Sequence, residues 1–349
     1  MPAAVKVTAG VLVGEGVIHR VGVDHQPLCR PRTSRTRGLV FAPGVPAGRG
    51  LVPTLLGATM TAVVDELVIT EPGVYDIPED VYHADPVPGG SLSASGAGKL
   101  LSPSCPALFK YDRDNPKATP RKVFDVGRAA HKVVLGSGPE LVLVDRERWD
   151  TNEVKAKVAA IRGAGGVPLK RDEWDMVHAM AAALREHPTA AALLHPDYGH
   201  AEQSLFWVDK SGGVWRRARV DWLRVRGPGR LIVPDYKTCV CAAPDGLDKV
   251  INDRGYHRSG AWYLDAVRAL GLDDQPAFVL IFQEKTPPYL VTVVEPDREA
   301  LRIGAIENRI ALELYRHCTE TGVWPGYADD VIPVALPGWV AARYNQEIR

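Results

Sequence analysis

Apolar and polar residues alternate in several short segments of the second half of the chain, which predicts β-strands there. The segments 201–209 (AEQSLFWVD) and 214–225 (VWRRARVDWLRV) show this alternation, and the KSGG between them favours a hairpin turn. We expect a third strand at 230–238 (RLIVPDYKT) and a further pair at 278–285 and 288–295, around a Thr-Pro-Pro turn. Five such segments are enough to build a central β-sheet.

Apolar positions with a helical period lie before, between and after these strands. Val126, Ala130 and Val134 form one such stripe, which ends at Gly136. The predicted helices cover approximately residues 91–102, 106–113, 121–136, 151–162, 171–186, 246–270 and 297–320. Helices on both sides of a strand block predict an α/β (mixed α+β) fold with a central mixed β-sheet flanked by helices.

The first 59 residues differ from the rest. They are rich in Gly, Pro, Val, Arg and Thr, follow neither period, and carry seven basic side chains against two acidic ones. We expect 1–59 to be a disordered or dispensable N-terminal extension and 60–349 to form a single domain. Translation from Met60 is one hypothesis that explains the change in composition, and a basic tail that touches DNA is another.

Charge and composition exclude several classes of protein. Lys plus Arg and Asp plus Glu both number 42, so bulk charge does not favour a protein that coats nucleic acid, although an enzyme can still grip DNA locally. No apolar run reaches the ~18 residues of a membrane-spanning helix, and the N-terminus does not read as a signal peptide. The five cysteines form no regular framework, which indicates reduced thiols and a cytoplasmic location.

Three familiar motifs are absent. The GAGK at 96–99 lacks the remaining glycine and the Ser or Thr of a phosphate-binding loop, so we expect no requirement for ATP. No G-x-S-x-G pattern is present, which disfavours a serine hydrolase. Cys239 and Cys241 have no second cysteine pair at zinc-finger spacing.

The most informative stretch joins the second and third predicted strands. Alternation places Arg217, Arg219 and Asp221 on one face of a strand, and Asp235 with Lys237 on one face of the next. If these strands pair with those faces together, two carboxylates and an ammonium converge, and two carboxylates with waters are what Mg²⁺ prefers. The alternative is an ordinary surface salt bridge between Asp235 and Lys237.

The order of the segments resembles the PD-(D/E)xK nuclease superfamily, and more closely its exodeoxyribonuclease VIII (RecE-like) branch of phage and prophage exonucleases. The pieces that carry this resemblance are SLSASGAGKLLSPSCPALFK, FDVGRAAHKVVLG, AEQSLFWVD, RARVDWL, IVPDYKT, GYHRSGAWYLDAV and FQEKTPPYLVTVVE, followed by WPGY and LPGW. It covers about residues 75–339 and implies a restriction-endonuclease-like core.

The resemblance also implies roles for individual residues. The metal ligands are His131, Asp221, Asp235 and the backbone carbonyl of Tyr236; the ion is Mg²⁺, and the imidazole would also suit Mn²⁺. The remaining catalytic roles fall to Lys237, which positions the attacking water, to Glu202 beside the metal and to Tyr263. Related nucleases carry Gln four residues before this Tyr, whereas this chain has Ser259, for which Arg258 or His257 would have to compensate.

The expected DNA contacts lie on two elements. They are Ser93, Ser95 and Lys99 at a predicted helix start, and Arg217 and Arg219 on the second strand. Each also has a simpler role, helix capping for the serines and pairing with acids for the arginines.

These observations predict a Mg²⁺-dependent exodeoxyribonuclease that digests duplex DNA from an end and leaves single strands for recombination. A single-strand annealing recombinase and a ring-shaped homo-oligomer are the partners implied by analogy. The alternatives are an endonuclease or repair nuclease of the same fold, and a DNA-binding protein with a decayed nuclease centre.

Overall fold

A computed structural model describes the chain over residues 67–115, 125–224 and 229–347. Every described residue belongs to one compact unit, residues 63–349. The extension expected at 1–59 and the first four residues of the helix expected at 121–136 lie outside the described residues.

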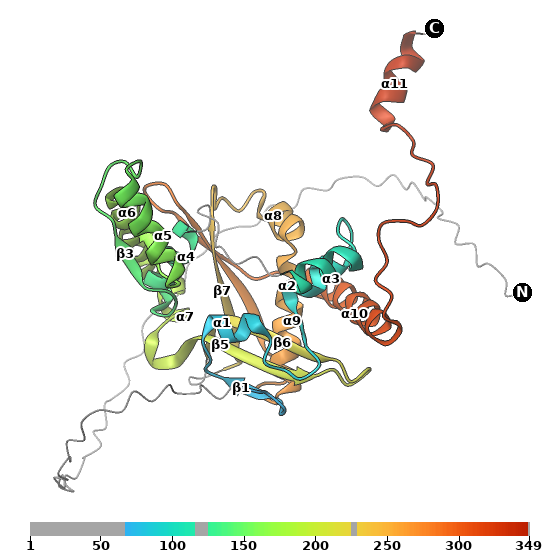
Figure 1. Cartoon of the computed structure of the whole chain (residues 1–349), viewed down its shortest axis with the longest axis horizontal. Helices are drawn as coiled ribbons and strands as arrows, with labels where there is room; N and C mark the ends of the chain where they lie inside the picture. Colours follow the sequence, from blue (N-terminus) through green and yellow to red (C-terminus); the bar gives the residue numbers. More distant parts are fainter. Residues whose placement is uncertain (1–66, 116–124, 225–228, 348–349) are drawn as a thin grey trace, which may run out of the picture. The chain divides into compact units, whose positions relative to one another are not determined.

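The described strands confirm all five that the sequence predicts and add four short ones (Figure 1). In chain order they are β1 (Gly73–Tyr75), β2 (Leu92–Ser93), β3 (Leu141–Leu143), β4 (Val167–Leu169), β5 (Gly199–Val208), β6 (Trp215–Arg224), β7 (Ile232–Cys239), β8 (Ala277–Glu284) and β9 (Val291–Val294).

The described helices confirm most of the predicted ones. They are α1 (Glu79–Ala84), α2 (Ala94–Leu100), α3 (Pro106–Asp114), α4 (Asp125–Leu135), α5 (Asn152–Gly163), α6 (Arg171–Glu186), α7 (Pro188–Leu193), α8 (Leu247–Arg254), α9 (Tyr256–Ala269), α10 (Arg298–Thr321) and α11 (Gly338–Glu347), with a 3₁₀ turn at Pro196–Tyr198. None of these helices is long and apolar enough to cross a lipid bilayer.

The strands form mixed sheets. One sheet has the order β1-β5-β6-β2 and another the order β7-β8-β9, while β3 and β4 form a separate pair. β5 and β6 are the antiparallel hairpin that the KSGG turn predicts, and Gly213 in that turn has a φ of 67°, which glycine adopts without strain. β2 runs parallel to β6, and β7 runs parallel to β8.

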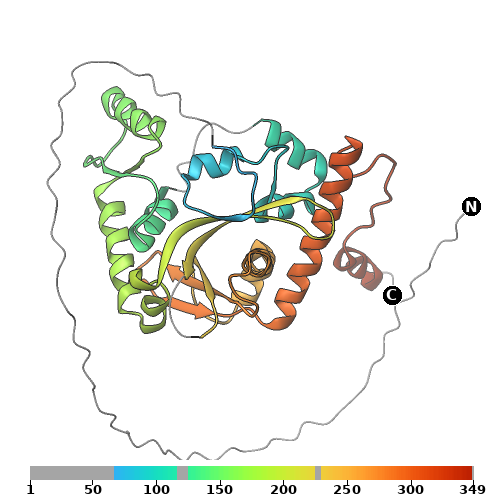
Figure 2. The ribbon, with the colours of Figure 1, turned by 90° about the horizontal axis from the view of Figure 1, so that it is seen from below.

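Helices cover both faces of these strands. Consecutive strand residues point to opposite faces, so neighbouring residues of one strand pack against different helices. On β8, Leu280 packs in a cluster with Trp262 of α9 and other residues of α9 and α10, whereas Ile281 packs with Ala130 of α4 and Met180 of α6. Figure 2 shows α9 nearly along its axis, between the strands and α10. The predicted α/β architecture is therefore confirmed.

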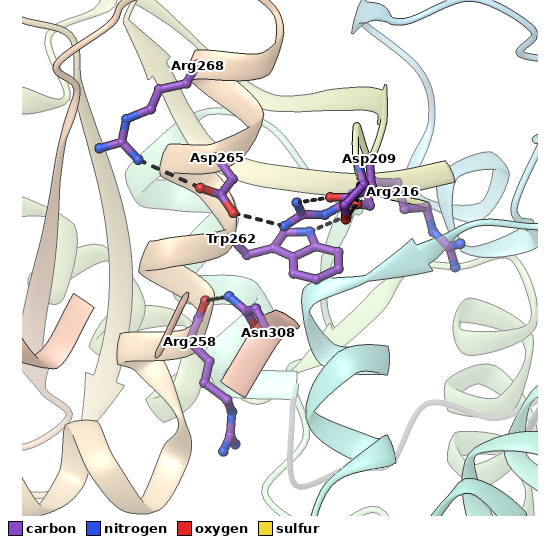
Figure 3. A network of polar contacts seen from close by, with 9 residues as sticks. Asp209, Arg216, Arg258, Trp262, Asp265, Arg268 and Asn308 are labelled. Atoms are coloured by element: carbon purple, nitrogen blue, oxygen red, sulfur yellow. Dashed lines mark hydrogen bonds and ion pairs between the residues drawn. The ribbon is translucent and has the colours of Figure 1, made fainter. Parts of the chain in front are cut away.

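A buried arginine ties the hairpin to α9 (Figure 3). The guanidinium of Arg216, which is only 4% exposed, lies 4.7 Å from the ring centre of Trp207 and 3.9 Å from that of Trp262. Its nitrogens contact Asp209 and Asp265, each at 3.3 Å. This cation is thus paired and stacked, as a buried charge must be.

One sequence prediction about the C-terminal half is wrong. The single helix expected over 246–270 is two helices, because Gly255 has a φ of 67° and ends α8 before α9 begins. A β-carbon there would lie 2.2 Å from a nitrogen of Arg258, so the break also makes room for that side chain. The segment after α10 contains α11, and the large side chains of Leu336 and Trp339 there are exposed.

Candidate metal centre and active site

Asp221 lies where β6 and β7 run side by side. Among the described residues no ladder of backbone hydrogen bonds joins these two strands. Instead, the backbone N–H of Tyr236 donates to Oδ2 of Asp221 over 2.7 Å. The same oxygen lies 3.8 Å from Nζ of Lys237 and 3.9 Å from Nδ1 of His131. Asp221 is therefore fixed by β7 while its carboxylate faces the Lys237 ammonium and the His131 imidazole.

Asp235 and Lys237 form a close ion pair on β7. Their Oδ2 and Nζ atoms are 2.6 Å apart, and Asp235 is 2% exposed. Burial raises the pKa of Asp235 to about 7, although the ammonium opposes that shift. Burial lowers the pKa of Lys237, but the carboxylates of Asp221 and Asp235 outweigh it and raise that pKa, so the lysine stays charged.

Glu202 lies on β5 at a residue with an unusual backbone conformation. Its neighbours Ala201 and Gln203 pair with Trp222 and Val220, so Glu202 stands opposite Asp221 in the hairpin. Its φ is 56°, a left-handed conformation that is rare for a residue with a side chain and rarer within a strand. Nε of Arg219 donates to its carboxylate over 2.8 Å. Burial, followed by the nearby Asp221 charge, raises the pKa of Glu202.

His131, Glu202 and Asp221 form a group suited to a divalent cation. Each offers one donor atom, and these atoms lie within 4.8 Å of one another. Opposite ligands of a Mg²⁺ ion are about 4.2 Å apart, so small side-chain rotations would close the group around it. Burial lowers the pKa of His131, which keeps the imidazole in its neutral, ligating form despite Asp221. The donor set fits Mg²⁺ or Mn²⁺.

The structure arranges the expected ligands differently from the sequence-based hypothesis in one respect. Glu202, expected beside the metal, belongs to the donor group, whereas Asp235 lies outside it and is held by Lys237. The side chain of Tyr236 is fully buried and its hydroxyl donates to Gln283, while its backbone hydrogen-bonds His131. The carbonyl of Tyr236 therefore remains a proposed ligand.

The donor group lines a cavity of about 450 Å³. Ser259 and Tyr263 of α9 both line it, so the position expected to carry Gln does face the site. Burial raises the pKa of Tyr263 well above its usual value, so its phenol stays neutral. His257 and Arg258 do not line the cavity, because both pair with Glu307 of α10; they cannot replace the missing amide.

Only some of the residues expected to contact DNA line the cavity. Ser93 and Ser95 line the cavity, and Ser93 also accepts the backbone N–H of Gly96 as the N-cap of α2. Lys99 points elsewhere and pairs with Asp112 over 2.8 Å. The two arginines pair with acids: Arg217 with Asp85 over 2.6 Å, and Arg219 with Glu202.

The residues that line the cavity and that sequence reasoning missed include Glu79 and His83 of α1 and Arg128 of α4. Arg128 precedes His131 by three positions on a helix, a spacing that places both on one face and that would have found it. No pattern in the sequence marks α1, a helix of six residues.

Comparisons with known proteins identify the family and the fold. A family model described as "PDDEXK-like domain of unknown function (DUF3799)" matches residues 93–332. A solved structure from Eubacterium rectale, described as "Putative exonuclease", is 14% identical, with 76% of this chain and 98% of that chain covered and a TM-score of 0.51. That likeness shows a shared fold.

A second solved structure, SSO0001, is 16% identical, with 58% of this chain and 95% of that chain covered, but its TM-score of 0.24 is too low to support an argument. No curated protein matches the sequence. The family match spans more than half of the chain and includes the metal group, Lys237 and Tyr263. The chain therefore belongs to the PDDEXK-like family DUF3799, within the PD-(D/E)xK nuclease superfamily.

Proposed function

We propose that this protein is a metal-dependent exodeoxyribonuclease that digests duplex DNA from an end without ATP. The observation that carries the proposal is the cavity lined by His131, Glu202 and Asp221, with Nζ of Lys237, the partner of Asp235, 3.8 Å from Oδ2 of Asp221. The family and the fold support a nuclease. The preference for DNA ends rests on the sequence resemblance.

The metal centre comprises His131, Glu202 and Asp221, with the carbonyl of Tyr236 and the carboxylate of Asp235 as further proposed ligands. A bound Mg²⁺ or Mn²⁺ would supply positive charge that stabilises a phosphate as it accumulates negative charge. Asp221 is oriented for this role by the Tyr236 N–H, and Glu202 by Arg219.

Lys237 acts on the attacking water. Two carboxylates hold its ammonium charged and at a fixed place, 2.6 Å from Asp235 and 3.8 Å from Asp221. From there it orients the water for in-line attack on the phosphorus and offsets charge in the transition state. Tyr263, a neutral phenol at the cavity wall, donates a hydrogen bond to the substrate.

We propose that Ser93 and Ser95 contact phosphate oxygens where they line the cavity, and that the exposed Lys99 contacts the backbone further out. Arg217 and Arg219, which hold Asp85 and Glu202, shape the site through those acids. The main role of both arginines is then to position these carboxylates, rather than to contact DNA directly.

The test is cleavage of linear and covalently closed circular duplex DNA in Mg²⁺ without ATP. We expect linear DNA to be degraded, circles to be spared and the Asp235→Ala variant to be silent. Cleavage of circles would instead establish an endonuclease. If neither Mg²⁺ nor Mn²⁺ supports cleavage while DNA still binds, the nuclease centre is decayed.

Of the wider proposals, the recombinase partner and the ring rest on the resemblance, the cytoplasmic location on the cysteines, and the domain bounds on the composition of residues 1–59. The enzyme acts in the cytoplasm of a bacterial or phage-infected cell, with a single-strand annealing recombinase as partner, and assembles as a ring. Residues 60–349 form the nuclease domain, and 1–59 are dispensable for it. Light scattering tests the assembly, and mass spectrometry of the native N-terminus tests whether translation begins at Met60.

A further inference from the structure

A carboxylate, an imidazole and a guanidinium from two helices meet at the cavity, apart from the metal group. Nε2 of His83 lies 3.7 Å from the carboxylate of Glu79, and Nη2 of Arg128 lies 3.6 Å from its other oxygen. All three line the cavity that holds His131, Glu202 and Asp221. The hydrogen bond from His83 and the charge of Arg128 lower the pKa of Glu79 despite burial, so it is a carboxylate at neutral pH.

The fold fixes Glu79 in this place. Tyr82, on the same helix, is 6% exposed, and its ring lies beside the guanidinium groups of Arg217 and Arg219, at 5.4 and 6.0 Å. Asp85, which ends the helix, pairs with Arg217 over 2.6 Å. Helix α1 is therefore anchored to β6, and Glu79 is held at the cavity.

The other arginine that lines the cavity is already engaged. Arg219 is 13% exposed and donates to Glu202, to the carbonyl of Ile77 and to Ser204. Within the described residues, Glu79 is the ion-pair partner of Arg128, whose side chain is 26% exposed. A guanidinium binds carboxylate and phosphate oxygens through the same donors, so an anion that enters the cavity competes with Glu79 for Arg128.

We propose that Arg128 binds a phosphate of the DNA and that Glu79 occupies the place of that phosphate when DNA is absent. Binding of DNA then displaces the Glu79 carboxylate, because two anions do not share one guanidinium at close range. Glu79 thereby lowers the affinity of the protein for DNA. This inference rests on the proposed function, since it takes DNA as the ligand of the cavity.

The experiment measures binding of a fluorescently labelled linear duplex by anisotropy at several KCl concentrations. Ca²⁺ replaces Mg²⁺, and a gel verifies that the DNA stays intact. The variants are Arg128→Gln and Glu79→Gln in the full chain. Each has a control that removes the same charge from the same helix but does not line the cavity, Lys132→Gln and Asp80→Asn.

We expect Arg128→Gln to bind about five- to tenfold more weakly and to reduce the salt dependence of log K by about 0.9, the value for one lost phosphate contact. Glu79→Gln should bind about three- to fivefold more tightly than the wild type, whereas both controls stay within about twofold, because salt screens charges outside the cavity. An unchanged salt slope in Arg128→Gln, or a Glu79→Gln variant that binds no more tightly than Asp80→Asn, would overturn the inference.

Two further readouts separate this inference from the proposed function. Thermal stabilisation by Mn²⁺ should be the same in Glu79→Gln and the wild type; its loss would make Glu79 a metal ligand and would also overturn the inference. A wild-type protein that neither binds nor cleaves DNA refutes the proposed function. A wild-type protein that cleaves DNA, with an Arg128→Gln variant that matches Lys132→Gln, refutes the inference alone.

Discussion

The left-handed backbone of Glu202 predicts that glycine is more stable than alanine at this position, the reverse of the usual order in a strand. Glycine within a strand is normally less stable than alanine by about 0.5–1 kcal/mol, because its unfolded chain has more freedom. At a φ of 56°, however, a side chain costs about 1–2 kcal/mol that glycine does not incur. The difference predicts that Glu202→Gly is more stable than Glu202→Ala by about 0.5–1 kcal/mol.

Both variants lose the carboxylate and its bond to Arg219, so their comparison isolates the backbone. The assay is urea unfolding in EDTA, which compares transition midpoints at equal slopes. His200 provides the matched control, because it is exposed on the same strand and is absent from the positive-φ residues. There Ala should be the more stable residue by about 0.5–1 kcal/mol.

An alanine variant at 202 that equals or exceeds the glycine variant would refute the strain argument. If the reversal is found, the chain tolerates about 1 kcal/mol of strain at this position. We then expect glutamate to occupy this position because its carboxylate binds the metal. Both Glu202→Ala and Glu202→Gly should therefore lose the stabilisation by Mn²⁺. Such stabilisation in the Glu202→Gly variant would show that Glu202 is no metal ligand.

Three more predictions follow. Mn²⁺ at about 100 times its Kd should stabilise the wild type by about 2.7 kcal/mol in calorimetry and leave Asp221→Asn unchanged. Lys237→Ala should lower the free energy of unfolding in EDTA by about 3 kcal/mol, since it leaves Asp235 buried and unpaired, and adding Asp235→Asn should recover most of the loss. Arg216→Ala should cost about 2 kcal/mol through lost stacking on two tryptophans, with the Mn²⁺ response unchanged.

The sequence predicted the strands and the longer helices well, because their patterns are local. β5, β6 and the KSGG turn appear where the alternation places them. The break at Gly255 was missed because the apolar period continues through it, and the conformation of a single glycine decides the outcome. The short elements α1, β1 and β2 are stabilised by contacts with β5 and β6, which no local pattern records.

The site was predictable in its residue types and less so in its geometry. The spacing of Asp221, Asp235 and Lys237 brought the right groups together, since alternation fixes which faces they share. Glu202 joins the donor group because of one backbone angle, its positive φ. Asp235 lies outside that group because it is buried and paired with Lys237. Sequence periodicity carries neither.

The separation of β6 from β7 explains why the site lies where it does. Two strands joined by a full ladder would use the Tyr236 N–H for a backbone carbonyl, and the carboxylate of Asp221 would lose its anchor. Here the side chain accepts that N–H over 2.7 Å, so the backbone donor is satisfied and Asp221 is oriented by one bond. Nδ1 of His131 on α4 lies 3.9 Å from the same carboxylate. Closing this ladder would therefore remove a proposed metal ligand, which makes the irregular sheet a requirement of the proposed centre.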